Sequence, residues 1–173
     1  MRAASSAIAS PSASTGIGLS RVAVSGLSGV SGVSGVEVGT EKAWEVCDRL
    51  HLPRLIFVGQ MDKEHANFER VFADVKAHLS PKVLPVEVPI GEGSTFRGIV
   101  NLFSGKSHIY KPGTKSGEYD EVEVPAEHQA EVKKYSDLLI ETVAATDDAL
   151  IERYLSGEEI PLDEVIAALK AAV

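Results

Sequence analysis

RLIFVGQMD, residues 54–62, is a run of apolar residues that ends in a polar loop. Residues 55–58 form a continuous apolar strand, the kind that is buried on both faces of a parallel sheet. Gly59, Gln60 and Asp62 then lie in a loop at the C-terminal end of that strand. In open α/β sheets this edge is where ligands bind. The pattern therefore predicts an α/β fold with its candidate site in this loop.

Helices are predicted on both sides of this strand. Thr40 can cap the first, which has Glu41 in its first turn and ends before Pro53. Its apolar positions at helical spacing are Ala43, Cys47 and Leu50, so Cys47 is interpreted as a small core residue rather than a nucleophile. The second helix covers residues 66–79, and its predicted core face is Phe68, Val71, Phe72 and Val75.

The rest of the chain predicts a small sheet followed by helices. Residues 83–90 read as an edge strand because two prolines interrupt them. Residues 98–103 and 106–110 read as strands joined by a tight turn, and residues 119–124 alternate as another strand. Three helices follow, beginning near residues 125, 147 and 161. The order indicates an α/β part that leads into an α+β part.

Charge divides the 173-residue chain unevenly. Its net charge is −8, but residues 1–36 contain Arg2 and Arg21 and no Asp or Glu. Residues 37–173 therefore carry a net charge of −10, from 15 basic and 25 acidic side chains. An acidic balance argues against a DNA-binding or membrane-surface protein. No apolar run approaches the roughly 20 residues that span a bilayer.

Residues 1–35 form a low-complexity tail rich in Ser, Ala and Gly. Few large side chains are present to join a core, so one interpretation is a disordered or misassigned N-terminus. The acid-free, Arg-containing composition is also typical of an organellar transit peptide, which stays the alternative to a cytoplasmic location.

Gly105, Lys106 and Ser107 match the last three positions of a phosphate-binding P-loop, GxxxxGK[ST]. The first glycine of that pattern is replaced by Val100, and the following residues predict a strand rather than a helix. The tripeptide is therefore interpreted as a hairpin turn. One cysteine and scattered histidines predict no metal site.

Asp62 carries the most informative chemistry. A carboxylate in the loop after a buried strand can accept two N–H donors from the edge of a guanine base, which separates guanine from adenine. An aspartate in such a loop also occurs for turn geometry alone.

Residues 33–173 resemble elongation factor G and its relatives, the translational GTPases of ribosomal translocation. The resemblance starts in VSGVEVGTEKAWEVCDRLHLPRLIFVGQMDKEHANFERV and continues through VEVPIGEGSTFRGIVNLFSG. In that family the strand ends in Asn-Lys-x-Asp, and the Asp reads guanine. Here Asp62 keeps the Asp position, whereas Gly59 and Gln60 replace the Asn and the Lys.

This resemblance implies a partial sheet of the P-loop GTPase type with an inserted α+β subdomain. Residues 36–80 would be the late part of a GTP-binding domain, and residues 81–173 the insert with its C-terminal helices. GTP or GDP is the implied ligand, and the ribosome and its stalk protein are the implied partners. The P-loop and switch motifs do not occur in the chain, so Mg²⁺ is not expected and the chain alone is expected not to hydrolyse GTP.

Two alternatives stay open. The chain can be a non-catalytic module that binds the ribosomal stalk, or a truncated product without function. The resemblance also implies that the early strands of the family's sheet are missing, so residues 55–58 are expected at a sheet edge with limited stability. Tail residues such as 22–24 are the alternative source of the missing pairing.

Overall fold

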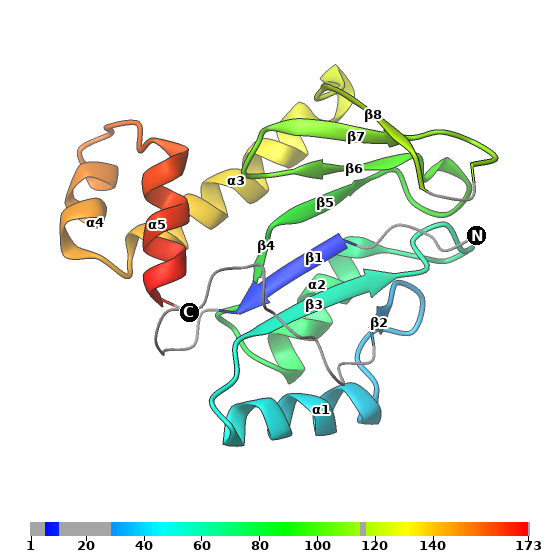
Figure 1. Ribbon diagram of the computed structural model, residues 1–173, viewed down its shortest axis with the longest axis horizontal. Coiled ribbons are helices and arrows are strands. Elements are labelled where there is room, and N and C mark those ends of the chain that lie inside the picture. The colour runs from blue at the N-terminus through cyan, green and yellow to red at the C-terminus, as the bar shows by residue number, and fades with distance from the viewer. Residues whose placement is uncertain (1–5, 11–28, 115–116, 173) are drawn as a thin grey trace.

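A computed structural model describes residues 6–10, 29–114 and 117–172. Two four-stranded sheets contain all the named strands of these residues. The first sheet has the order β2, β3, β1, β4, which are the strands Val30–Ser31, Arg54–Gly59, Ser6–Ser10 and Leu84–Pro85. β2 is parallel to β3, whereas β1 is antiparallel to both of its neighbours, β3 and β4. In Figure 1 this sheet lies at the centre, above α1.

The second sheet is antiparallel throughout and has the order β5, β6, β7, β8. Its strands are Glu87–Ile90, Gly98–Asn101, Lys106–Tyr110 and Tyr119–Glu123. The single edge strand predicted for residues 83–90 is two short strands, β4 and β5, each at the end of a different sheet. Pro85 and Pro89 have no N–H to donate, so both are compatible with edge positions.

Five α-helices occupy the described residues, and the four later ones agree with the sequence. They are α1 Val38–Arg49, α2 Phe68–His78, α3 Gln129–Ala144, α4 Asp148–Leu155 and α5 Leu162–Ala172. Short 3₁₀ turns lie at η2 Gly93–Thr95 and η3 Ala126–His128. The cap predicted for α1 was wrong, because Glu37 is its N-cap and Thr40 is buried inside the helix. Leu50 was also predicted on the core face and is 57% exposed.

The environment of β3 differs from the prediction in two respects. β3 is an inner strand, because β1 and β2 pair with its two edges. It is buried on one face only: Ile56 and Val58 are buried, whereas Phe57 is 38% exposed. β1 comes from the tail, so residues 6–10 supply the pairing that the sequence analysis considered for residues 22–24, which lie outside the described residues.

One continuous apolar core connects the two sheets. Its centre is an aromatic group in which Phe68 and Phe72 of α2 meet Tyr135 of α3. The Phe68 and Tyr135 rings are 5.7 Å apart at 80°, and the Phe72 and Tyr135 rings are 6.0 Å apart at 79°. α2 carries the predicted core face, with Phe68, Val71, Phe72 and Val75 all buried. The α/β fold class is confirmed, with the qualification that the first sheet is mixed.

Candidate functional site

The candidate loop, residues 59–67, connects the end of β3 to the start of α2. β2 and β3 are parallel, so their carboxyl ends lie at the same edge of the sheet. Hydrogen bonds to the turn after β2, residues 32–36, fix both ends of the loop. Gly32 N donates to Gly59 O at 2.7 Å, and Asn67 N donates to Gly32 O at 3.0 Å. The sequence analysis placed the site at this edge, and the loop does lie there.

Gln60 and Asp62 lie in this loop as predicted, whereas Gly59 is the last residue of β3 and pairs with Ser31 of β2. A Cβ added to Gly59 would meet no atom within 4 Å, so the position has room for a side chain. Gln60 has a φ of 62°, and its Oε1 accepts a hydrogen bond from Ser31 Oγ at 2.7 Å. The Asp62 side chain is 37% exposed, and Lys63 Nζ lies 3.9 Å from it. Asp62 is therefore accessible to a ligand.

Met61 anchors the loop and was not identified from the sequence. Its side chain is fully buried, although both neighbouring residues are exposed. It packs against Gly32 so closely that a Cβ on Gly32 would lie 2.7 Å from the Met61 sulfur. A large apolar residue in an otherwise polar loop was the available signal. The burial of Met61 fixes the backbone next to Asp62.

The 91–95 loop, between β5 and β6, is a second group that the sequence did not identify. Gly93 N donates to Met61 O at 2.8 Å. The Glu92 carboxylate accepts from Phe68 N at 2.5 Å and from Asn67 Nδ2 at 3.1 Å. A carboxylate at the start of α2 is also favoured by the helix dipole. The second sheet therefore contributes directly to the candidate site.

Ser31, the last residue of β2, and the turn that follows it, residues 32–36, complete the site. Ser31 Oγ accepts from the backbone of Val33 and Ser34, at 3.2 Å in each case. Arg70 of α2 donates to Val33 O at 2.5 Å. These contacts fix the Ser31 hydroxyl that donates to the Gln60 side chain.

This arrangement suits the recognition of a base edge better than the binding of phosphate. The exposed Asp62 carboxylate can accept two N–H donors, and its negative charge would repel a phosphate. Gly105 has a φ of 63°, and Lys106 begins β7 and pairs with Glu123. The hairpin interpretation of Gly105, Lys106 and Ser107 is therefore confirmed. Among the described residues no group of three or more His, Cys, Asp or Glu could hold a metal ion.

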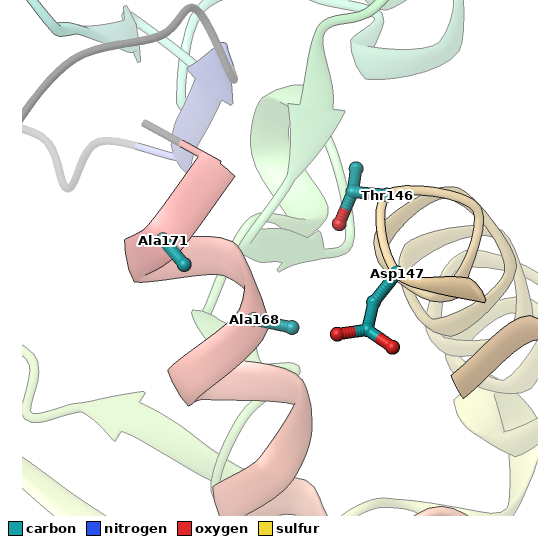
Figure 2. A pocket seen from close by; sticks show the side chains of 4 residues that line it. All are labelled: Thr146, Asp147, Ala168 and Ala171. Carbon is teal, nitrogen blue, oxygen red and sulfur yellow. The ribbon is translucent and has the colours of Figure 1, made fainter. Parts of the chain in front are cut away.

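A small cleft lies at a different place, between α5 and the junction of α3 and α4. Its volume is about 180 Å³, and its lining residues are Thr146, Asp147, Ala168 and Ala171 (Figure 2). Ligand pockets are usually larger, at roughly 300–1,000 Å³. The Asp147 carboxylate caps α4 by accepting from Ala149 N and Leu150 N. We therefore do not assign a ligand to this cleft.

The titratable groups with shifted pKa values lie mainly away from the loop, and one cluster is on the second sheet. Burial raises the pKa of Glu87 and raises the pKa of Tyr110 to about 12. His108 and Tyr119 lie on the same face, with their rings stacked 4.3 Å apart. Such shifts also occur in purely structural clusters.

No protein-family model matches the chain. Its fold is similar to the crystal structure of ttk003000868 from Thermus thermophilus, with 35% sequence identity and a TM-score of 0.68. The similarity covers 83% of this chain and 21% of the Thermus protein, so the chain spans about a fifth of that protein's length. The fold and the comparison thus define an α/β protein similar to a segment of a longer bacterial protein. None of the described helices is long and apolar enough to cross a membrane.

Proposed function

We propose that this chain is a segment of an elongation factor G-type translational GTPase and that its 59–67 loop contacts guanine. The main support is Asp62, an exposed carboxylate in a loop that is held at the carboxyl edge of two parallel strands. The family resemblance of residues 33–173 supports the same assignment. The chain alone does not hydrolyse GTP in this proposal, because its sequence supplies no phosphate or Mg²⁺ contacts.

A titration of the full chain with a fluorescent GDP derivative tests the guanine contact. We expect weak binding, with a Kd above about 1 µM, because the base contact acts without a phosphate cradle. Asp62→Asn should reverse the preference from GDP to xanthosine diphosphate, since the Asn amide can donate to the carbonyl oxygen that replaces the guanine amino group. Asp163→Asn, an exposed change on α5, is the control. The proposal would be refuted if wild type and Asp62→Asn each bound GDP and xanthosine diphosphate with equal affinity.

The two altered motif positions allow a complementary gain-of-binding test. Gly59→Asn fits the open space at Gly59, and Gln60→Lys restores the cation that the family has next to it. We expect the double variant to bind fluorescent GDP more tightly than wild type while its unfolding midpoint changes little. Unchanged affinity in a folded double variant would count against a guanine site in this loop.

A second function, a module that binds the ribosomal stalk protein without nucleotide, is favoured by one surface. Leu155 is 77% exposed at the end of α4, and Leu162 is 37% exposed at the start of α5. Purified stalk protein should retain the wild-type chain and lose Leu155→Ser, whereas Asp62→Asn should be retained. Retention no greater than that of bare resin would exclude this function. We propose a cytoplasmic location, with an organelle as the alternative suggested by the N-terminal composition.

A further inference from the structure

The 91–95 loop belongs to the second sheet, yet it contacts the 59–67 loop on both sides of Asp62. On one side Gly93 N binds Met61 O, directly before Asp62. On the other side Glu92 binds Asn67 and Phe68, where the loop enters α2. The four residues between Asp62 and Asn67 are exposed except for Ala66. The conformation of Asp62 therefore depends on these two attachments together with those to the turn after β2.

The geometry of the 91–95 loop is tightly specified. Gly91 has a φ of 74°, and a Cβ there would overlap with Thr95 O. Gly93 has a φ of 57°, and its Cβ position is 3.4 Å from Lys63 O. Glu92 N donates to Thr95 Oγ1 at 3.1 Å, and Thr95 Oγ1 donates back to Glu92 O at 2.7 Å. The backbone of Glu92 is therefore fixed independently of its side-chain contacts.

Two N–H groups donate to the Glu92 side chain, so it must supply two acceptor oxygens. Its two carboxylate oxygens bind separate N–H groups, Phe68 N and Asn67 Nδ2. The amide of a glutamine has only one acceptor oxygen, so its NH₂ group would face one of these donors. Asn67 also caps α2, because its Oδ1 accepts from Arg70 N at 2.7 Å. The charge and the two-oxygen geometry of Glu92 thus both contribute to the start of α2.

We infer that Glu92 is a positioning residue for Asp62, through which the second sheet sets the orientation of the guanine-contacting loop. The role in guanine binding rests on the proposed function of Asp62. The statement that Glu92 fixes the backbone of the 59–67 loop does not depend on that function. Glu92 itself has no contact with the base in this assignment. It acts through the backbone from residue 61 to residue 68.

Hydrogen exchange in the full chain tests the structural part without nucleotide. Glu92→Gln should accelerate exchange of the Lys63 and Ala66 amides, which donate to Gln60 O and Lys63 O, about tenfold, as expected for the loss of one charge-assisted hydrogen bond. Asn67→Asp should act in the same direction, because it keeps the α2 cap and places a second carboxylate beside Glu92. Glu152→Gln on α4 is the charge-matched control and should change nothing. Unchanged exchange of the Lys63 and Ala66 amides, or equal acceleration in β6 and β7, would overturn the inference.

The nucleotide preference tests the functional part. Inosine lacks the 2-amino group, so a correctly placed Asp62 should favour GDP over IDP by about tenfold. Glu92→Gln should lower the ratio of GDP affinity to IDP affinity. A general structural loss would instead weaken the binding of both nucleotides equally and leave the ratio unchanged. A ratio unchanged by Glu92→Gln overturns the positioning role. If the wild type binds neither nucleotide, the guanine function fails and the exchange experiment alone decides on Glu92.

Discussion

Glu87 is a partly buried carboxylate on the second sheet, away from the candidate loop. It lies on β5, opposite Asn101 of β6, on the same face of the second sheet as His108 and Tyr110. Burial raises its pKa, and the favourable charge of His108 only partly opposes this. The charge of Glu87 in turn contributes to the raised pKa of Tyr110. These groups interact as one cluster, so a change at Glu87 affects the whole sheet face.

The raised pKa of Glu87 makes its contribution to stability depend on pH. Between the ordinary pKa of Glu87 and its raised value, the folded state binds more protons than the unfolded state. The stability contributed by the protonated form is present below the ordinary pKa and is lost as the pH rises through the raised value. Glu87→Gln, neutral at every pH, should therefore gain stability relative to wild type as the pH rises above about 4.5, the ordinary pKa of a glutamate.

Urea unfolding of both proteins at several pH values measures this effect. Glu152→Gln, which removes an exposed carboxylate on α4, is the control. Its difference from wild type in the free energy of unfolding should not change with pH. A Glu87→Gln difference that is equally flat over the same pH range would contradict the burial argument. The tyrosinate titration gives an independent check, since Glu87→Gln should lower the pKa of Tyr110 from about 12.

Among the secondary-structure elements, α2 connects the candidate loop to both of its neighbouring segments. Its N-terminus binds Glu92, and Arg70 binds the turn after β2. Asp74 accepts from Val36 N at 2.6 Å and lies 2.9 Å from His78 Nδ1. Gly35 is required beside this contact, since its φ is 79° and a Cβ there would overlap with the Asp74 carboxylate. α2 thus holds the turn that leads into α1.

Removing the Asp74 carboxylate should leave Val36 N without its side-chain acceptor. We expect Asp74→Ala to lower the free energy of unfolding by about 1–3 kcal/mol. Asp74→Asn should cost less, because its amide oxygen can still accept the hydrogen bond. Denaturant unfolding with exposed Asp163→Ala as the reference provides the measurement. Equal midpoints for Asp74→Ala and Asp163→Ala would show that the contact contributes nothing.

The two sheets share one apolar core, and at its centre α2 and α3 meet through aromatic rings. Phe68 and Phe72 lie on α2 and Tyr135 lies on α3. In Figure 1 α2 lies behind the first sheet and α3 behind the second. Lys134 and Glu69 add an exposed ion pair across the same junction, with an Nζ to Oε1 distance of 2.7 Å. Such exposed pairs contribute little, so the apolar contact provides most of the stabilisation. We therefore expect the described parts to unfold as one cooperative unit.

Trp44, the only tryptophan, is buried in α1 and reports on the first layer. Phe72→Leu should lower stability by about 1–2 kcal/mol and should shift the Trp44 fluorescence and far-UV circular dichroism midpoints together. Phe57→Leu, at a position that is 38% exposed, is the matched control and should shift both midpoints less. A Phe72→Leu protein whose circular dichroism transition moves while the Trp44 transition does not would show two independent units.

The local sequence pattern was sufficient to predict those elements whose structure depends on interactions between residues close together in the chain. The apolar spacing of α2 identified its core face. The predicted start near residue 147 agrees with α4, which Asp147 caps. The hairpin between β6 and β7 followed from its turn residues. Long-range contacts were not predictable in this way. The pairing of β1 with β3 joins residues 6–10 to residues 54–58, and nothing in either segment specifies the other.

The candidate site shows the same division. Residue types and their order placed Gln60 and Asp62 after a strand, at the edge where ligands bind, because strand and loop propensities act locally. Gly59 was predicted in the loop and is the last residue of the strand, since its pairing with Ser31 is a long-range contact. Only the tertiary structure brings Glu92 and Ser31 to that loop. Glu92 is 25 residues from its partner Asn67 along the chain, and Ser31 is 29 residues from its partner Gln60. The same holds for the burial of β3 on one face only, because exposure depends on which distant segments cover a strand.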